Sequence, residues 1–160
     1  MTSIFFYDTQ IGKIGIGQQN DKIIAIVFDG EKYDSSWEEK DTPFKKKVLK
    51  QMEEYLEGKR KTFDIDIYIN TTEFSNKVLK EISKIAYGKT TSYRDIAISI
   101  GNPKASRAVG TVCNRNPLPL IIPCHRVIAT NGSLVGYRGG IDVKKQLLDL
   151  EMRMRRKLER

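Results

Sequence analysis

The stretch SYRDIAISIGNPKASRAVGTV, residues 92–112, predicts two short helices joined by a tight turn. A serine and an aspartate three positions apart, at the start of this stretch, form a capping pattern, and the helix that they open stops at Gly101. Asn102 and Pro103 then open the next helix at once. Two short helices with a glycine at the corner are typical of a helix-turn-helix, a DNA-binding motif. The motif is weak evidence alone, because any small helical domain has such corners.

Positive charge gathers in the half of the chain that holds this corner. Residues 71–160 carry 17 Lys and Arg against 7 Asp and Glu, whereas residues 1–70 carry 11 against 13. The net charge of +8 therefore comes entirely from the second half. Such segregation indicates a surface that binds a polyanion, most often nucleic acid. A merely solvated surface is the alternative, because five of the charges belong to a basic tail: Arg153, Arg155, Arg156, Lys157 and Arg160.

The sequence on either side of the corner predicts two more helices and one irregular segment. A final helix spans Asp142–Leu158, and residues 116–128, with three prolines in an apolar run, predict irregular backbone or a short strand. Residues 70–73 cap a helix with a single apolar stripe: Phe74, Val78, Ile82 and Ile85. We expect residues 71–160 to form one mainly helical domain.

The first half, residues 1–70, predicts a small α+β domain with an antiparallel sheet. Thr42 and Pro43 begin a helix that ends at Gly58, and alternating apolar and polar residues over 63–69 predict a half-buried strand. Three short apolar segments predict a strand meander before that helix: Ile4–Tyr7, Ile11–Ile16 and Ile23–Phe28. This half holds no catalytic constellation, so we expect it to be structural.

Composition excludes several classes of protein. Hydrophobic residues make up 39% of the chain and charged residues 30%, which fits neither a disordered nor a membrane protein. No apolar run approaches the roughly 20 residues that span a bilayer, and the N-terminus lacks the pattern of a secretory signal. Two cysteines cannot build a disulfide scaffold, which favours a reducing, cytoplasmic setting. The chain has one histidine, which excludes histidine-rich metal sites.

The stretch LIIPCHRVI, residues 120–128, holds the residues best suited to chemistry. Cys124 follows a proline and precedes His125, and histidine is the natural base for making a reactive thiolate. Because neighbouring side chains point apart, transfer through one water suits this pair as well as a direct bond. An inert core residue is the alternative for Cys124 and the favoured interpretation of Cys113. Zinc bound by the two cysteines and His125 would lack a fourth ligand.

Residues 71–160 resemble the O6-alkylguanine-DNA alkyltransferases, also called methylated-DNA–protein-cysteine methyltransferases. The segment Pro-Cys-His-Arg-Val at 123–127 is highly specific to that family, whereas residues 1–70 match it only in length and strand–helix pattern. The flanking blocks occur in the family's order: Gly88 with Ser92-Tyr93, residues 101–110, Asn116-Pro117, residues 136–140, and Lys144 with Leu147-Leu148 and Glu151. The resemblance implies that residues 71–160 form a winged-helix-like domain that contains the helix-turn-helix.

The resemblance also implies an activity, direct-reversal DNA repair. Cys124 would take the alkyl group from O6-alkylguanine, and from O4-alkylthymine, in a single irreversible transfer that requires no cofactor. His125 would draw the thiol proton through a water, and Glu151 would orient and charge-stabilise that histidine. Asn116 would brace the active-site turn. Because a thioether does not hydrolyse and no second nucleophile is evident, we expect the protein to act once.

DNA contacts follow from the same resemblance. Tyr93 would crowd the target phosphate, help to rotate the nucleotide out of the duplex, and offer its hydroxyl proton to the guanine ring. Arg107 would fill the place of the extruded base, whose flipping costs about a few kcal/mol. Four residues align with positions that touch the DNA backbone: Ser75, Arg94, Asn102 and Thr130. Three would wall the alkyl pocket: Tyr137, Arg138 and Gly139. The expected partner is double-stranded DNA, bound in the minor groove by a monomer, without a membrane.

Two departures from the family pattern stand out. Some members bind zinc in the first domain through Cys and His, but this chain has neither before residue 113, so that site is absent. Position 138 is arginine, where a small polar residue is common. Its side chain would narrow the pocket or add a phosphate contact.

Two other functions compete with repair by alkyl transfer. A non-catalytic protein that binds alkylated DNA, or a regulatory helix-turn-helix protein, would use the basic half but leaves Cys124, His125 and Glu151 unexplained. A thiol hydrolase would need a route to turnover, and the sequence marks no leaving-group acid.

Overall fold

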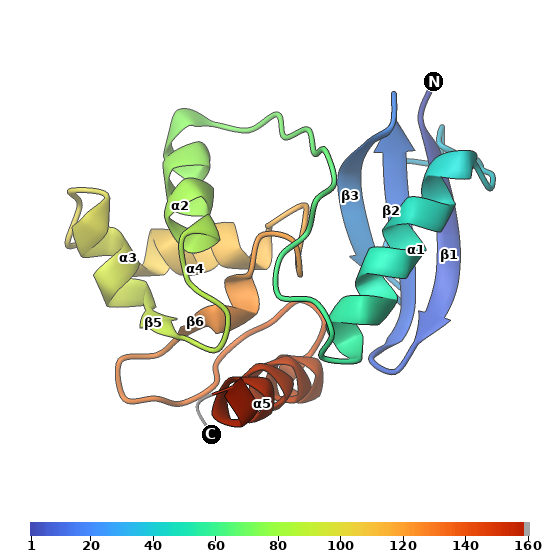
Figure 1. Ribbon diagram of the computed structural model, residues 1–160. Helices are drawn as coiled ribbons and strands as arrows, with labels where there is room; N and C mark the ends of the chain where they lie inside the picture. The colour runs from blue at the N-terminus through green and yellow to red at the C-terminus, as the bar shows by residue number, and fades with distance from the viewer. Residues whose placement is uncertain (159–160) are drawn as a thin grey trace. The chain divides into compact units, whose positions relative to one another are not determined.

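The computed structural model describes residues 1–158, so Arg160 of the basic tail lies outside the described residues. The chain divides into two compact units, Met1–Ile69 and a second that begins at Asn70. Figure 1 shows the first as a sheet with one long helix and the second as mainly helical. The α+β fold class is confirmed. None of the helices described in residues 1–158 is both long and apolar enough to cross a membrane.

The sheet of the first unit has four strands in the order β3-β2-β1-β4. The three predicted strands are confirmed, and each pairs antiparallel with its neighbour along the chain. A two-residue strand that the sequence did not predict runs parallel to β1 at the edge. The strands are β1 (Ser3–Thr9), β2 (Gly12–Gln19), β3 (Lys22–Phe28) and β4 (Glu38–Glu39).

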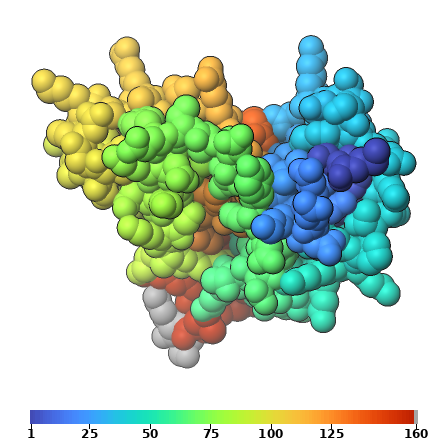
Figure 2. All heavy atoms as spheres, turned by 90° about the horizontal axis from the view of Figure 1, so that it is seen from above, coloured from blue at the N-terminus to red at the C-terminus, as the bar shows by residue number. Residues whose placement is uncertain are grey.

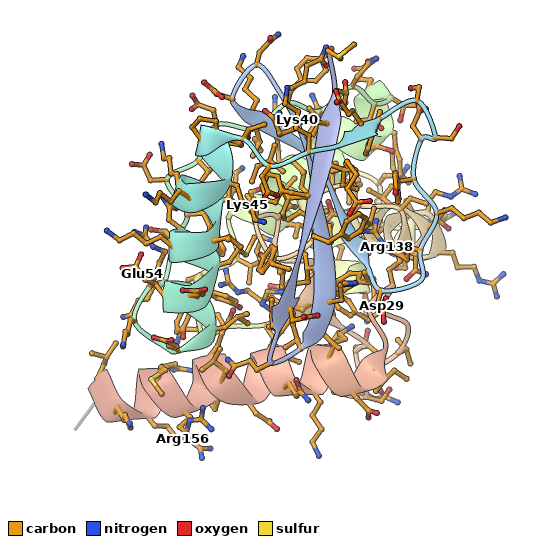
Figure 3. The ribbon with its side chains drawn as sticks, turned by 90° about the vertical axis from the view of Figure 1, so that its right-hand side faces the viewer. Asp29, Lys40, Lys45, Glu54, Arg138 and Arg156 are labelled. Carbon is orange, nitrogen blue, oxygen red and sulfur yellow. The ribbon has the colours of Figure 1, made fainter. Side chains whose placement is uncertain are left out.

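Helix α1 (Pro43–Leu56) lies along this sheet, as Figures 1 and 3 show, and closes the core of the unit. Its residues Val48, Met52 and Tyr55 lie on one face at helical spacing and are fully buried. The helix ends before Gly58, whose positive φ of 78° suits a residue without a Cβ.

The predicted strand over residues 63–69 is wrong. The segment makes only an isolated bridge, between Ile67 and Ile23 of β3. The physical reason is that the Gln51 side chain hydrogen-bonds the main chain of Asp64. It donates to the Asp64 carbonyl at 3.0 Å and accepts from the Asp64 N–H at 2.8 Å. These groups are then no longer available to a neighbouring strand.

The second unit packs helices around two short parallel strands. Residue pairs Thr91–Val127 and Ser92–Ile128 join these strands, although their residues lie far apart in the sequence. The elements are α2 (Glu73–Ser83), β5 (Thr91–Ser92), α3 (Tyr93–Ser99), α4 (Ser106–Asn114), β6 (Val127–Ile128) and α5 (Ile141–Leu158). The turn that carries Cys124 leads into β6, and Tyr93, which follows β5, lies near the Cys124 thiol.

Side-chain caps begin two of these helices as the sequence predicts. The Thr72 hydroxyl accepts a hydrogen bond from the N–H of Ser75 at 3.1 Å, and the Ser92 hydroxyl accepts one from the N–H of Asp95 at 3.0 Å. Each bond satisfies a backbone donor that has no partner inside the helix.

The prediction that Asn102 and Pro103 open a helix at once is wrong, because α4 begins only at Ser106. The N–H of Asn102 bonds to the carbonyl of Ala97 at 2.9 Å, and that of Gly101 to Ile98 at 3.0 Å. This pair of bonds is a Schellman motif, so Asn102 still belongs to the end of α3. The chain needs a further turn before a new helix can start.

Candidate active site

Cys124 begins a single 3-10 turn (Cys124–Arg126) that leads directly into β6. Two short backbone bonds hold the turn: the N–H of Cys124 to the carbonyl of Ile122 at 2.7 Å, and the N–H of Arg126 to that of Pro123 at 2.9 Å. The cysteine is only 3% exposed. Burial raises the pKa of the Cys124 thiol, against the opposing effects of Asn116, Arg138 and Lys144. The resting group is therefore a thiol, which needs a base before it can act as a nucleophile.

Asn116 braces the segment before the cysteine from a fully buried position. Its amide nitrogen donates to the carbonyl of Ile122 at 2.9 Å, and its amide oxygen accepts from the N–H of Leu118 at 2.9 Å. The same side chain lies near the Cys124 thiol and favours a lower pKa for it. Asn116 thus fixes both ends of the proline-rich segment that leads to Cys124.

His125 and Glu151 form a buried pair behind the nucleophile. His125 Nε2 lies 2.8 Å from Glu151 Oε2, and both side chains are at most 1% exposed. Burial lowers the pKa of His125 despite the nearby carboxylate, so the imidazole is neutral at rest. A neutral imidazole is the form that can take a proton.

Arg126 completes this network, and the sequence analysis assigned it no role. Its Nε and Nη2 donate to the two oxygens of Glu151 at 2.7 and 2.9 Å, a bidentate pair, while Nη1 donates to the carbonyl of Ile85 at 2.7 Å. The N–H of Gly88 also donates to Glu151, at 3.2 Å. Burial alone would raise the pKa of Glu151, but the hydrogen bonds from His125 and Arg126 hold it well below its usual range. The carboxylate is therefore fixed in its charged form.

Lys144 is a second residue whose role the sequence analysis missed. Its ammonium group is buried and donates to the carbonyl of Val127 at 2.7 Å and to that of Val135 at 3.3 Å. Burial lowers its pKa. The sequence signal that could have predicted the burial of Lys144 is its helical spacing. Lys144, Leu147 and Glu151 share one face of α5, and all three are buried.

Tyr93 closes the mouth of the site. Its hydroxyl donates to the carbonyl of Val135 at 3.1 Å, which joins the start of α3 to the loop before α5. Burial, with the neighbouring thiols of Cys113 and Cys124, raises the pKa of Tyr93 to about 12, so the hydroxyl keeps its proton. Tyr93 also lies near the thiol of Cys124.

A hollow of about 410 Å³ lies directly outside this closure. It contains four of the residues that the sequence analysis assigned to DNA: Tyr93, Arg94, Arg107 and Thr130. Two others lie elsewhere. Ser75 lines a separate hollow of about 210 Å³ beside Arg115, and Asn102 is exposed in the turn between α3 and α4. Figure 2 shows long side chains that project from the yellow part of the surface, the segment that holds α3 and the start of α4.

The three expected pocket residues lie together on the loop before α5. Tyr137, Arg138 and Gly139 are all half-buried, and Figure 3 labels Arg138 on this loop. The guanidinium of Arg138 donates to the main-chain carbonyl of Asn116 at 2.5 Å. Within residues 1–158, no three His, Cys, Asp or Glu side chains gather as metal ligands would.

Two family models match the chain and together extend over most of it. A family model described as the DNA-binding domain of 6-O-methylguanine DNA methyltransferase matches residues 73–153, and its ribonuclease-like domain matches residues 5–69. The chain belongs to the 6-O-methylguanine DNA methyltransferase family. The resemblance that the sequence analysis drew from residues 123–127 and the flanking blocks is thereby confirmed.

Relatives within the family extend over nearly the whole chain. A methylated-DNA–protein-cysteine methyltransferase of Methanosarcina acetivorans is 48% identical over 72% of this chain and 74% of its own length. The constitutive enzyme of that name from Bacillus subtilis is 38% identical over 90% of this chain and 92% of its own. The crystal structure of Mycobacterium tuberculosis OGT in complex with DNA has a TM-score of 0.90 and 34% identity, covering 95% of this chain and 94% of that one.

Proposed function

We propose that this protein repairs DNA by moving the alkyl group of O6-alkylguanine onto Cys124, once per molecule. One observation carries the proposal. Cys124 and the neutral His125 lie buried in the 3-10 turn, and His125 hydrogen-bonds the charged Glu151 of α5. The names of the relatives, methylated-DNA–protein-cysteine methyltransferases, describe this reaction class. Transfer from O4-alkylthymine and a cytoplasmic location stay predictions.

The reaction balances without a cofactor. His125 takes the Cys124 proton through one water, and the resulting thiolate attacks the saturated alkyl carbon. A sulfur–carbon bond forms while the bond from that carbon to the guanine oxygen breaks, and the oxygen leaves with the electron pair. A proton on the guanine ring offsets the charge that develops there, and the protonated Tyr93 hydroxyl at the mouth of the site is its proposed donor. Glu151 holds the imidazole while it carries the extra proton.

The hollow outside Tyr93 is the proposed DNA surface. A modified base inside a duplex is out of reach of a buried thiol, so the nucleotide must be flipped past the contact between Tyr93 and Val135. Arg107, which is exposed on the first turn of α4 and lines this hollow, is the proposed residue that fills the gap in the base stack. The M. tuberculosis relative was crystallised with DNA, which supports DNA as the partner. Minor-groove binding by a monomer is part of the proposal.

Intact-protein mass after incubation with duplex that contains O6-methylguanine tests the proposed function. We expect a stoichiometric gain of one methyl group on the peptide that contains Cys124, with no turnover beyond one equivalent. Binding without a mass change would instead identify a non-catalytic DNA-binding protein. Multiple turnovers without a stable adduct would identify a thiol hydrolase.

Replacing Arg107 by alanine is expected to slow transfer from duplex DNA far more than transfer from free O6-benzylguanine. The free base needs no flipping and leaves no gap to fill, so only the reaction with duplex DNA depends on the Arg107 side chain that fills the gap. Rates from single-turnover measurements on both substrates provide the comparison. Lys104→Ala is the matched control, because it removes one exposed positive charge from the same corner. Equal slowing of Arg107→Ala on both substrates would assign this residue to the pocket.

Alkylation of Cys124 is expected to lower the melting temperature of the protein, and benzyl should lower it more than methyl. The sulfur is buried, so a new group must displace packed neighbours, and overpacking of this kind costs about 1–3 kcal/mol. Thermal melts before and after stoichiometric reaction measure the shift. A melting temperature that stays unchanged or rises with benzyl would contradict the close packing around Cys124.

A further inference from the structure

Arg138 turns inward, toward the segment that carries the nucleophile. Its Nη1 donates to the Asn116 carbonyl at 2.5 Å, a short bond from a charged donor. The Asn116 side chain in turn donates to the carbonyl of Ile122 at 2.9 Å, and the N–H of Cys124 donates to that same carbonyl at 2.7 Å. Arg138 is therefore connected to the backbone of the nucleophile through Asn116 and Ile122. The family resemblance leaves two roles open for an arginine here, a narrower pocket or a phosphate contact, and this geometry indicates a third.

A buried thiol that must lose its proton needs positive charge nearby, because burial disfavours the thiolate. Arg138 and Lys144 are the two cations whose charge favours the thiolate of Cys124. Lys144 lies in α5 and its Nζ is directed at the carbonyls of Val127 and Val135. The other ionisable groups around Cys124 come from α3, α4, the 3-10 turn and α5: Tyr93, Cys113, His125, Arg126 and Glu151.

We propose that Arg138 is a positioning residue of the transfer site, which fixes the Asn116 segment and supplies positive charge beside the Cys124 sulfur. The inference rests on the proposed function and deepens it. Arg138 forms no covalent bond and moves no proton. When the thiol proton passes through water to His125, the guanidinium stabilises the negative charge left on sulfur, and that charge disappears as the sulfur–carbon bond forms.

The pH dependence of Cys124 alkylation by iodoacetamide tests this inference without any alkylguanine. The full chain is compared with Arg138→Gln, and the adduct is quantified on the peptide that contains Cys124. Because the guanidinium charge favours the thiolate, the midpoint for Arg138→Gln should rise, by about one unit if the effect is at the lower end for a neighbouring charge. The rate at neutral pH should fall about tenfold. Arg138→Lys should recover most of the midpoint shift, because it restores the charge.

Two further variants separate this role from a phosphate contact. Lys145→Gln, which removes an exposed charge from α5, should leave the pH midpoint unchanged. Arg94→Gln, in the hollow outside Tyr93, should weaken duplex binding and flatten its salt dependence without moving the midpoint. The inference is overturned if Arg138→Gln leaves the midpoint in place, and the phosphate role is then supported if this variant instead behaves like Arg94→Gln.

Failure of this inference is distinguishable from failure of the proposed function. A wild-type chain that gains no methyl group from O6-methylguanine duplex would refute the function, whatever the iodoacetamide profiles show. A normal methyl gain, together with identical pH profiles of iodoacetamide alkylation for wild type and Arg138→Gln, would refute only the role of Arg138. Melting curves of both Arg138 variants verify that the fold survives each substitution.

Discussion

Replacing Cys124 by serine is expected to abolish alkyl transfer from O6-methylguanine duplex and to leave duplex binding largely intact. A serine hydroxyl does not ionise near neutral pH, and a hard oxygen is a poor nucleophile for a saturated carbon, so the loss should reach several orders of magnitude. The hydroxyl fits the buried space and can still bond Asn116, so the fold should persist. Cys124 lies beneath the Tyr93 contact, not among the side chains that line the outer hollow.

The measurement is intact mass with peptide mapping, together with duplex binding by the same variant. Cys113→Ser is the matched control, because Cys113 is the other free cysteine and is also buried. Burial raises the pKa of Cys113 to about 12, so it should carry no alkyl group. A methyl group found on Cys113, or transfer that survives in Cys124→Ser, would contradict the assignment of the nucleophile.

Glu151→Gln is expected to reduce both stability and transfer. It leaves the buried Arg126 guanidinium without its charged partner, and removing one member of a buried ion pair costs about 3–5 kcal/mol. That is a large fraction of a typical total stability of about 5–15 kcal/mol. The same change frees His125 to rotate, so transfer should slow by up to about 10²–10⁴-fold, the range of a positioned base.

Acid should narrow the stability difference between Glu151→Gln and wild type. The pKa of Glu151 in the folded protein lies below its value of about 4.3 in an unfolded chain, so the carboxylate stabilises the fold above that value. This stabilisation is lost as the pH falls from about 4 toward the depressed folded pKa. Glutamine has no such titration. Denaturant unfolding at neutral and acidic pH measures the effect.

Asp149→Asn is the control for this prediction, since it removes an exposed carboxylate from the same helix, α5. It should change stability by no more than a few tenths of a kcal/mol. A loss in Glu151→Gln no larger than that of Asp149→Asn would show that the network of Arg126, His125 and Glu151 does not hold the fold together.

Local patterns determined most of the elements in this protein. The Thr72 and Ser92 caps and the glycines at 58 and 101 act through contacts within one or two helical turns, so the residues that decide them are adjacent in the sequence. The segment at 123–127 indicated the family and predicted the nucleophile. The predicted strand over residues 63–69 was wrong because the distant Gln51 side chain hydrogen-bonds the main chain of Asp64. The predicted start of α4 was wrong because Asn102 belongs to the C-terminal cap of α3.

The tertiary structure alone decided which charges meet in the interior. Arg126 and Lys144 look in the sequence like ordinary surface residues of a basic domain, but both are buried and paired. Their burial depends on the parallel pairing of β5 with β6 and on α5, whose partners lie far away in the chain. A charge leaves water only where several such elements supply hydrogen bonds together. The sequence therefore determined the family and most of the helices and strands, and it predicted Cys124, His125 and Glu151 as a set, whereas only the folded chain decided that Arg126, Lys144 and Arg138 turn inward to that set.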